Sequence, residues 1–190
     1  MSDGPLTLWV LRHAKAARDD PGGDRTRPLT KRGRRQAESV RDHLGSLTTP
    51  EQRRLPGLVV SSPAARARET AELVMPALPR AAFTLEEVLY SEEAPEILEW
   101  LRKSAPGQRS IMLVGHNPTL EELCGLLEPR AAGGSRRSEP LGTAGLVGLE
   151  SAGSRLPVAE VSQQVYEAAN SWGQLREESW SVFHRFRPEP

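Results

Sequence analysis

Short apolar runs alternate with amphipathic stretches along most of the chain. The apolar runs predict buried strands at residues 6–11, 58–60 with Ser61 and Ser62 at the end, 83–85, 111–114, 146–149 and 180–186. Apolar positions at helical spacing predict helices at residues 31–44, 63–75, 95–103, 118–127 and 158–169. Strands that alternate with helices favour a mostly parallel sheet with helices on both faces. The predicted fold is therefore α/β, a three-layer α/β/α sandwich with a central, mostly parallel sheet.

Local signals refine this picture. Thr30 is a suitable N-cap for the helix at 31–44, and Pro63 suits the first turn of the helix at 63–75. Residues 12–28 are polar, with Pro and Gly in the middle, and residues 129–140 are rich in Gly, Arg and Ser, so both predict loops. The strand at 146–149 is expected close to the edge of the sheet.

Composition narrows the class of protein. A length of 190 residues suits one domain, spanning 1–190. The 25 basic residues balance the 25 acidic ones, which argues against a nucleic-acid partner. Cys124 is the single cysteine, which excludes an internal disulfide, and it is expected to be a small buried side chain. With no long apolar stretch and no signal peptide at the start, we expect a cytoplasmic monomer without a membrane partner.

Three separate segments place cationic and imidazole side chains at predicted strand ends. Arg12 and His13 follow the first strand, Ser62 and Arg66 follow the second, and His116 follows the strand at 111–114. Because ligands of such sheets bind beyond the carboxyl ends of the strands, these side chains are expected to converge on one site. The start of a helix just before Arg66 would also favour an anion there.

This set of residue types suits phosphate chemistry. A neutral imidazole can attack phosphorus and carry the phosphoryl group as a covalent intermediate. Guanidinium groups match phosphate oxygens and stay charged, and a second histidine, if protonated, can donate to the same oxygens. His13, beside Arg12, is the better nucleophile, and His116 is the better stabiliser of charge. No metal or other cofactor is expected, since the arginines neutralise the phosphate and no spaced cluster of metal ligands occurs.

The three segments resemble the signatures of a known family. LRHAKA, SSPAARARETA and VGHNP are similar to the blocks of the histidine phosphatase (phosphoglycerate mutase-like) superfamily, in order over residues 6–150. The segments TRPLT and VGHNPTLEEL make the chain most similar to the SixA-type phosphohistidine phosphatases. The resemblance implies a phosphoglycerate mutase-like fold and a phosphatase that forms a phosphohistidine intermediate.

Carried over residue by residue, the resemblance makes His13 the phosphorylated nucleophile. It places Arg12, Arg66 and His116 in the phosphate pocket as catalytic and substrate-binding residues. Arg27 would line the rim. Ser62 is expected to be a minor phosphate contact or a backbone cap. Asp19 lies where mutase-like relatives often have a polar residue that contacts phosphate, and its acidic side chain departs from that pattern.

The choice of substrate depends on the general acid. Mutase-like enzymes use a glutamate after the third strand as the general acid. In this chain four glutamates follow that strand, and the sequence around them does not identify one as the acid: Glu86, Glu87, Glu92 and Glu93. Since an imidazole has a pKa of about 6.5, it leaves phosphorus largely without help, whereas an alkoxide needs a positioned acid. This favours phosphoramidate substrates, and the resemblance to the SixA type implies a phosphohistidine protein as the substrate. The alternatives are a small-molecule phosphomonoesterase of the phosphoglycerate mutase-like type and a non-catalytic phosphohistidine-binding module.

Overall fold

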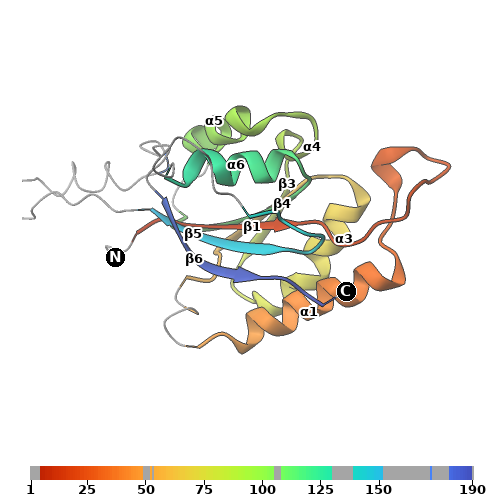
Figure 1. Cartoon of the computed structure of the whole chain (residues 1–190), viewed down its shortest axis with the longest axis horizontal. Coiled ribbons are helices and arrows are strands. Elements are labelled where there is room, and N and C mark those ends of the chain that lie inside the picture. The colour runs from red at the N-terminus through yellow and green to blue at the C-terminus, as the bar shows by residue number, and fades with distance from the viewer. Residues whose placement is uncertain are drawn as a thin grey trace, which may run out of the picture.

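Six strands form a single mixed sheet in the order β3-β2-β4-β1-β5-β6 (Figure 1). The computed structural model describes residues 5–48, 52, 54–104, 108–129, 139–151, 172 and 180–189. The strands are β1 (Thr7–Arg12), β2 (Leu58–Ser61), β3 (Ala82–Leu85), β4 (Ser110–Gly115), β5 (Leu146–Ser151) and β6 (Trp180–Phe186). β1, β2, β3 and β4 are parallel to one another, and β5 pairs antiparallel with both β1 and β6. The expected mostly parallel sheet is confirmed.

Helices cover both faces of this sheet, so the expected three layers are also confirmed. Figure 1 shows α4, α5 and α6 on one face and α1 and α3 on the other. The helices are α1 (Lys31–Ser46), α3 (Ala65–Val74), α4 (Val88–Ser91), α5 (Ala94–Ser104) and α6 (Thr119–Leu127), with 3-10 turns η1 (Asp24–Thr26) and η2 (Met75–Ala77). None of the helices in these described ranges is long and apolar enough to cross a membrane.

The alternation of side chains along each strand divides the core into two clusters. In β1, Leu8 and Val10 pack with the α5 and α6 side, whereas Trp9 and Leu11 pack with the α1 and α3 side. All four side chains are fully buried. Since both faces of the central strands are apolar, these strands occur in the sequence as continuous hydrophobic runs.

Outside the strands, Cys124 matches its expected role as a small buried side chain. Cys124 lies in the core on α6, where burial raises the pKa of its thiol to about 12, so it is a protonated packing residue. Trp172 and Trp180 are buried and stack on each other, with ring centroids 5.8 Å apart.

One prediction about elements was wrong, one short helix was not predicted, and two segments remain untested. Pro63 precedes α3 instead of lying in its first turn, because the chain stays extended through Ala64 before the helix begins. The short helix α4 was not predicted, since four residues are too few to show a helical period. β5 lies next to the edge strand β6, so its expected place close to the edge of the sheet is confirmed. The predicted helix at 158–169 and most of the 129–140 loop lie outside the described residues.

The start of α1 is fixed to the segment that follows β1. Thr30 caps the helix, as predicted, by accepting a hydrogen bond from the Gly33 N–H at 3.1 Å. Both the backbone N–H and the hydroxyl of Thr30 donate to the Lys15 carbonyl. A Cβ atom at Gly33 would lie 2.1 Å from that carbonyl oxygen, so only glycine permits this approach. The contact helps to hold the chain just after His13 in place.

We predict opposite effects of alanine at two glycines of α1. Gly33→Ala is expected to lower the free energy of unfolding by about 1–3 kcal/mol, the usual cost of overpacking. Gly45→Ala, at a position with nothing within 4 Å of the added Cβ, is the matched control. It should be neutral or stabilise the protein by up to about 1 kcal/mol, because alanine favours helix. Urea unfolding of both variants measures the difference, and equal effects would contradict the proposed contact.

Candidate active site

Parallel pairing of β1 with β4 brings the two histidines of the predicted site together. Arg12 pairs with Gly115 in register, and the His13 N–H donates to the Gly115 carbonyl at 3.0 Å. His13 and His116 therefore follow neighbouring strands at the same edge of the sheet. Their ring centroids are 5.0 Å apart.

The pairing of β2 with β4 adds the second segment to the same place. The Ser62 N–H donates to the Val114 carbonyl at 2.9 Å, and the Ser62 Oγ lies 2.9 Å from His116 Nε2. Ser62 Oγ also accepts a hydrogen bond from the Ala64 N–H at 3.3 Å. The expected capping role of Ser62 is thus present in the structure. Arg66 follows as the second residue of α3 and is buried.

His13 is arranged as a neutral nucleophile. Its Nδ1 lies 2.7 Å from the Ala14 carbonyl oxygen, which can only accept a hydrogen bond, so the ring proton belongs on Nδ1. The lone pair is then on Nε2. Burial lowers the His13 pKa to about 4, against the opposing effect of the Ala14 hydrogen bond, and the charges of Arg66 and Arg12 lower it further. Near neutral pH this imidazole is uncharged and able to attack phosphorus.

His116 is also neutral in this environment. Burial lowers its pKa to about 3, with further contributions from His13 and Arg66. When the Ser62 hydroxyl donates to Nε2, the ring proton lies on Nδ1. This Nδ1 is buried and has no hydrogen-bond partner in the described part of the chain. An N–H group in that position can donate to an anion without the ring being charged, whereas the sequence suggested a protonated ring.

The two arginines keep buried donors for an anion. Arg12 Nη1 donates to the Leu141 carbonyl at 2.8 Å, and Asn117 Nδ2 donates to the same oxygen at 2.9 Å. Within the ranges that the structure describes, the Nε atoms of Arg12 and Arg66 are buried and unpaired. Because an unpaired buried donor is costly, these groups favour a bound oxyanion.

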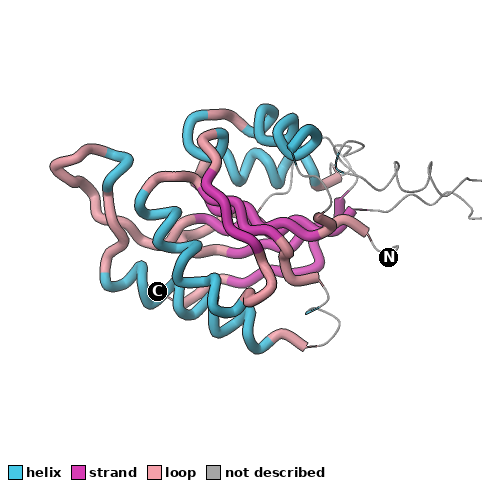
Figure 2. The backbone as a smooth tube through the Cα atoms, turned by 180° about the vertical axis from the view of Figure 1, so that it is seen from behind, coloured by secondary structure: helices cyan, strands magenta, loops and turns pink. Residues whose placement is uncertain are grey.

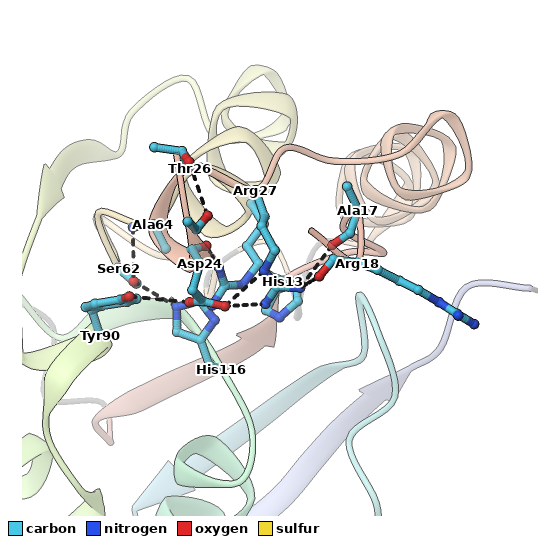
Figure 3. A network of polar contacts seen from close by, with 12 residues as sticks. His13, Ala17, Arg18, Asp24, Thr26, Arg27, Ser62, Ala64, Tyr90 and His116 are labelled. Carbon is cyan, nitrogen blue, oxygen red and sulfur yellow. Dashed lines mark hydrogen bonds and ion pairs between the residues drawn. The ribbon is translucent and has the colours of Figure 1, made fainter. Parts of the chain in front are cut away.

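An acidic residue that the sequence reasoning missed lies in the middle of the cations. Arg66 Nη1 donates to the Asp24 backbone carbonyl at 2.6 Å, and Arg66 Nη2 donates to Asp24 Oδ2 at 2.9 Å. Arg27 donates to Asp24 Oδ1 through Nε at 2.9 Å and Nη2 at 2.6 Å. The Tyr90 hydroxyl, also missed, lies 3.3 Å from Asp24 Oδ2. Figure 3 shows Asp24 between Arg27 and Tyr90, beside His116.

No local signal in the sequence singled out these two residues. The loop between β1 and α1 contains three aspartates, and Asp19, which was weighed for this region, is exposed. What distinguishes Asp24 from the other two aspartates is its contact with Arg66, which lies 42 residues further along the chain. Tyr90 lies on α4, the helix that was not predicted.

The other acidic candidates lie away from the two histidines. Glu87 binds Arg25 through two hydrogen bonds of 2.7 Å, and the Arg25 guanidinium lies over the Tyr90 ring. Among the described residues, no hydrogen bond or ion pair joins Glu86, Glu87, Glu92 or Glu93 to His13 or His116. The same residues contain no group of three or more side chains suited to hold a metal ion.

A neutral imidazole, the guanidinium groups of Arg12 and Arg66 and a second imidazole at the carboxyl ends of parallel strands form a candidate site for phosphoryl transfer. The family model of the histidine phosphatase superfamily (branch 1) matches residues 8–92. That segment contains the His13 and Arg66 blocks. Over these residues the chain is similar to the histidine phosphatase superfamily, and it is a phosphatase.

Solved structures refine this assignment to the SixA type. The chain is 26% identical to the protein named phosphohistidine phosphatase SixA from Agrobacterium tumefaciens, with 97% of this chain and 99% of that chain covered and a TM-score of 0.69. A protein of the same name from Nakamurella multipartitia is 22% identical, with 97% of each chain covered and a TM-score of 0.73. The structure of the protein histidine phosphatase SixA complexed with tungstate is 16% identical, covers 95% of this chain and 96% of that one, and has a TM-score of 0.63. No curated protein matches the chain.

We predict that His13 and His116 stay uncharged down to mildly acidic pH. The imidazole resonances of both rings, assigned by comparison with His13→Ala and His116→Ala, should shift little between about pH 8 and pH 5.5, since their pKa values lie near 4 and 3. NMR titration measures this directly. Midpoints close to about 6.5, the value of an exposed histidine, would contradict the burial argument.

The same groups should make folding sensitive to acid. Their pKa values are lower in the folded chain than in the unfolded one, so the unfolded state binds more protons between about pH 6.5 and pH 4. Their contribution to the free energy of unfolding is therefore complete above that window and is lost as the pH falls through it. Urea unfolding across this range should show a smaller loss for His13→Ala than for the native chain.

Proposed function

We propose that this phosphatase removes the phosphoryl group from phosphohistidine on a protein, through a phosphohistidine intermediate on its own His13. The observation that carries the proposal is the His13 ring, which is neutral and holds its Nδ1 proton on the Ala14 carbonyl. Nε2 is then the nucleophilic atom, among buried arginines.

The reaction has two displacements at phosphorus. In the first, His13 Nε2 bonds to phosphorus as the bond from phosphorus to the substrate imidazole breaks, and the leaving nitrogen takes the electron pair and then a proton. In the second, water attacks phosphorus and the bond to His13 Nε2 breaks, which releases inorganic phosphate and restores the neutral ring. Two such steps replace one direct displacement by water.

The surrounding side chains act on the oxygens of the phosphoryl group. Arg12 and Arg66 supply fixed charge and the buried Nε donors described above. His116 supplies the Nδ1 proton, with Ser62 holding the ring from its other nitrogen. Arg27 is placed at the rim, where it contacts Asp24. Positioned charge of this kind is the main source of catalysis in phosphoryl transfer.

The absence of a suitable acid among the described residues favours a nitrogen leaving group. Asp24 is the acidic side chain that contacts the pocket. Partial burial raises the pKa of its carboxyl, but hydrogen bonds from Arg66 and Arg27 outweigh this and hold the pKa below its ordinary value. An ionised carboxylate cannot protonate an alkoxide, whereas an imidazole leaves without such help. This supports a phosphoramidate substrate over a phosphate ester.

We predict that turnover depends on His13 and does not need added metal. With chelator present, the native chain should cleave a phosphohistidine protein or a simple phosphoramidate much faster than an alkyl phosphate. His13→Ala should lower the rate at least about 1,000-fold, because it removes the nucleophile. His43→Ala is the matched control, since His43 lies on α1 against His184 and Phe186 and outside the site.

The outcomes separate the three functions considered. Faster cleavage of the ester, lost on substitution of one of the four glutamates, would identify a small-molecule phosphomonoesterase. Phosphate binding without turnover, unchanged in His13→Ala, would identify a binding module. Activity that survives in His13→Ala would contradict the covalent mechanism itself.

A further inference from the structure

Asp24 occupies the donors that a phosphoryl group needs. The Arg66 side chain is only 6% exposed, and both of its outer nitrogens are bound to Asp24, one to the backbone carbonyl and one to the carboxylate. Guanidinium groups hold phosphate through these same outer nitrogens. A phosphoryl group that binds these outer nitrogens competes with Asp24 for them.

The Asp24 carboxylate resembles a bound anion more than a structural ion pair. It accepts from Arg66, Arg27 and the Tyr90 hydroxyl, so donors from three separate segments converge on its two oxygens. It is also half-exposed, at 53%, on the outer side of the buried Arg66. A side chain at this position can leave toward solvent without opening the core.

Apart from the contacts of Asp24 with Arg66, the segment that carries Asp24 is joined to α4 by an exposed ion pair. Its neighbour Arg25 pairs with Glu87, and the two side chains are 50% and 56% exposed. Pairs of this kind contribute little to stability because water screens them. This loop projects beyond the strand ends, as Figure 2 shows.

We propose that Asp24 is an internal competitor for the phosphate pocket, a carboxylate that holds Arg66 and Arg27 in place and that an incoming phosphoryl group displaces. The inference rests on the proposed function, because it concerns the same pocket. A carboxylate and a phosphoryl group cannot share these donors without repulsion between two anions at close range. An incoming anion must therefore bind Arg66 and Arg27 more strongly than the Asp24 carboxylate does. This requirement favours a dianionic phosphoryl group over a singly charged anion.

The test is the affinity of the pocket for inorganic phosphate in Asp24→Asn. The substitution keeps the shape of the side chain and removes its charge. We expect phosphate to bind about tenfold more tightly or better by calorimetry, as follows when a charged competitor is lost. The inhibition constant for phosphate in the turnover assay should fall by the same factor.

Asp20→Asn is the matched control. Asp20 lies on the same loop, and its carboxylate accepts from the Gly22 N–H and the Thr26 hydroxyl instead of from Arg66. It should leave phosphate affinity unchanged. An equal gain in both variants would overturn the proposal, because it would assign the effect to a loosened loop.

The remaining outcomes distinguish this inference from the proposed function. Weaker or unchanged phosphate binding in Asp24→Asn, with normal binding in the native chain, would overturn the role of Asp24 alone and make it a positioning residue for Arg66. Failure of the native chain, Asp20→Asn and Asp24→Asn to bind phosphate at all would overturn the pocket and the proposed function together.

Discussion

The positive charge of Arg66, almost entirely withdrawn from water, is the constraint on which the rest of the site depends. A buried cation is stable only if its donors are satisfied by an anion or by carbonyl oxygens. In this chain Asp24 provides both, through its carboxylate and its backbone carbonyl. The same requirement underlies the proposed binding of phosphate in this pocket.

Burial decides the protonation state of the histidines, and the nearby positive charge adds to its effect. A protonated imidazole near Arg12 and Arg66 would add charge to a region that is already cationic and partly dry. His13 and His116 are therefore neutral, with lowered pKa values. A single arrangement thus supplies both cations to hold a phosphoryl group and an uncharged nitrogen to attack it.

The backbone fixes these groups at the required distance. Because β1 and β4 are parallel neighbours in register, the residues after them lie side by side, and the Ala14 carbonyl then holds the His13 ring. The anchoring of α1 through Gly33 and Thr30 supports the same turn from the opposite side. Rigid elements of this kind allow a catalytic ring to keep its orientation while the outer loop exchanges one anion for another.

The sequence by itself determined the layered α/β fold and the four residues of the phosphate pocket. Arg12, His13, Arg66 and His116 could be predicted because each lies at or just after an apolar run, and parallel strands end at one edge of the sheet. Long elements with clear periodicity were predicted within two or three residues of their ends. The local order of apolar and polar residues contains this information.

Only the tertiary structure decided which acidic residue contacts Arg66 and Arg27, and whether an acidic residue is placed to protonate the leaving group. Asp24 is one of three aspartates in a loop without periodicity, and its partners come from α3 and α4. Tyr90 and Glu87 lie in or beside a helix of one turn, too short to leave a pattern. Contacts between such segments depend on how the chain packs. Side chains that are distant in sequence can contact one another only after the sheet has brought their segments together.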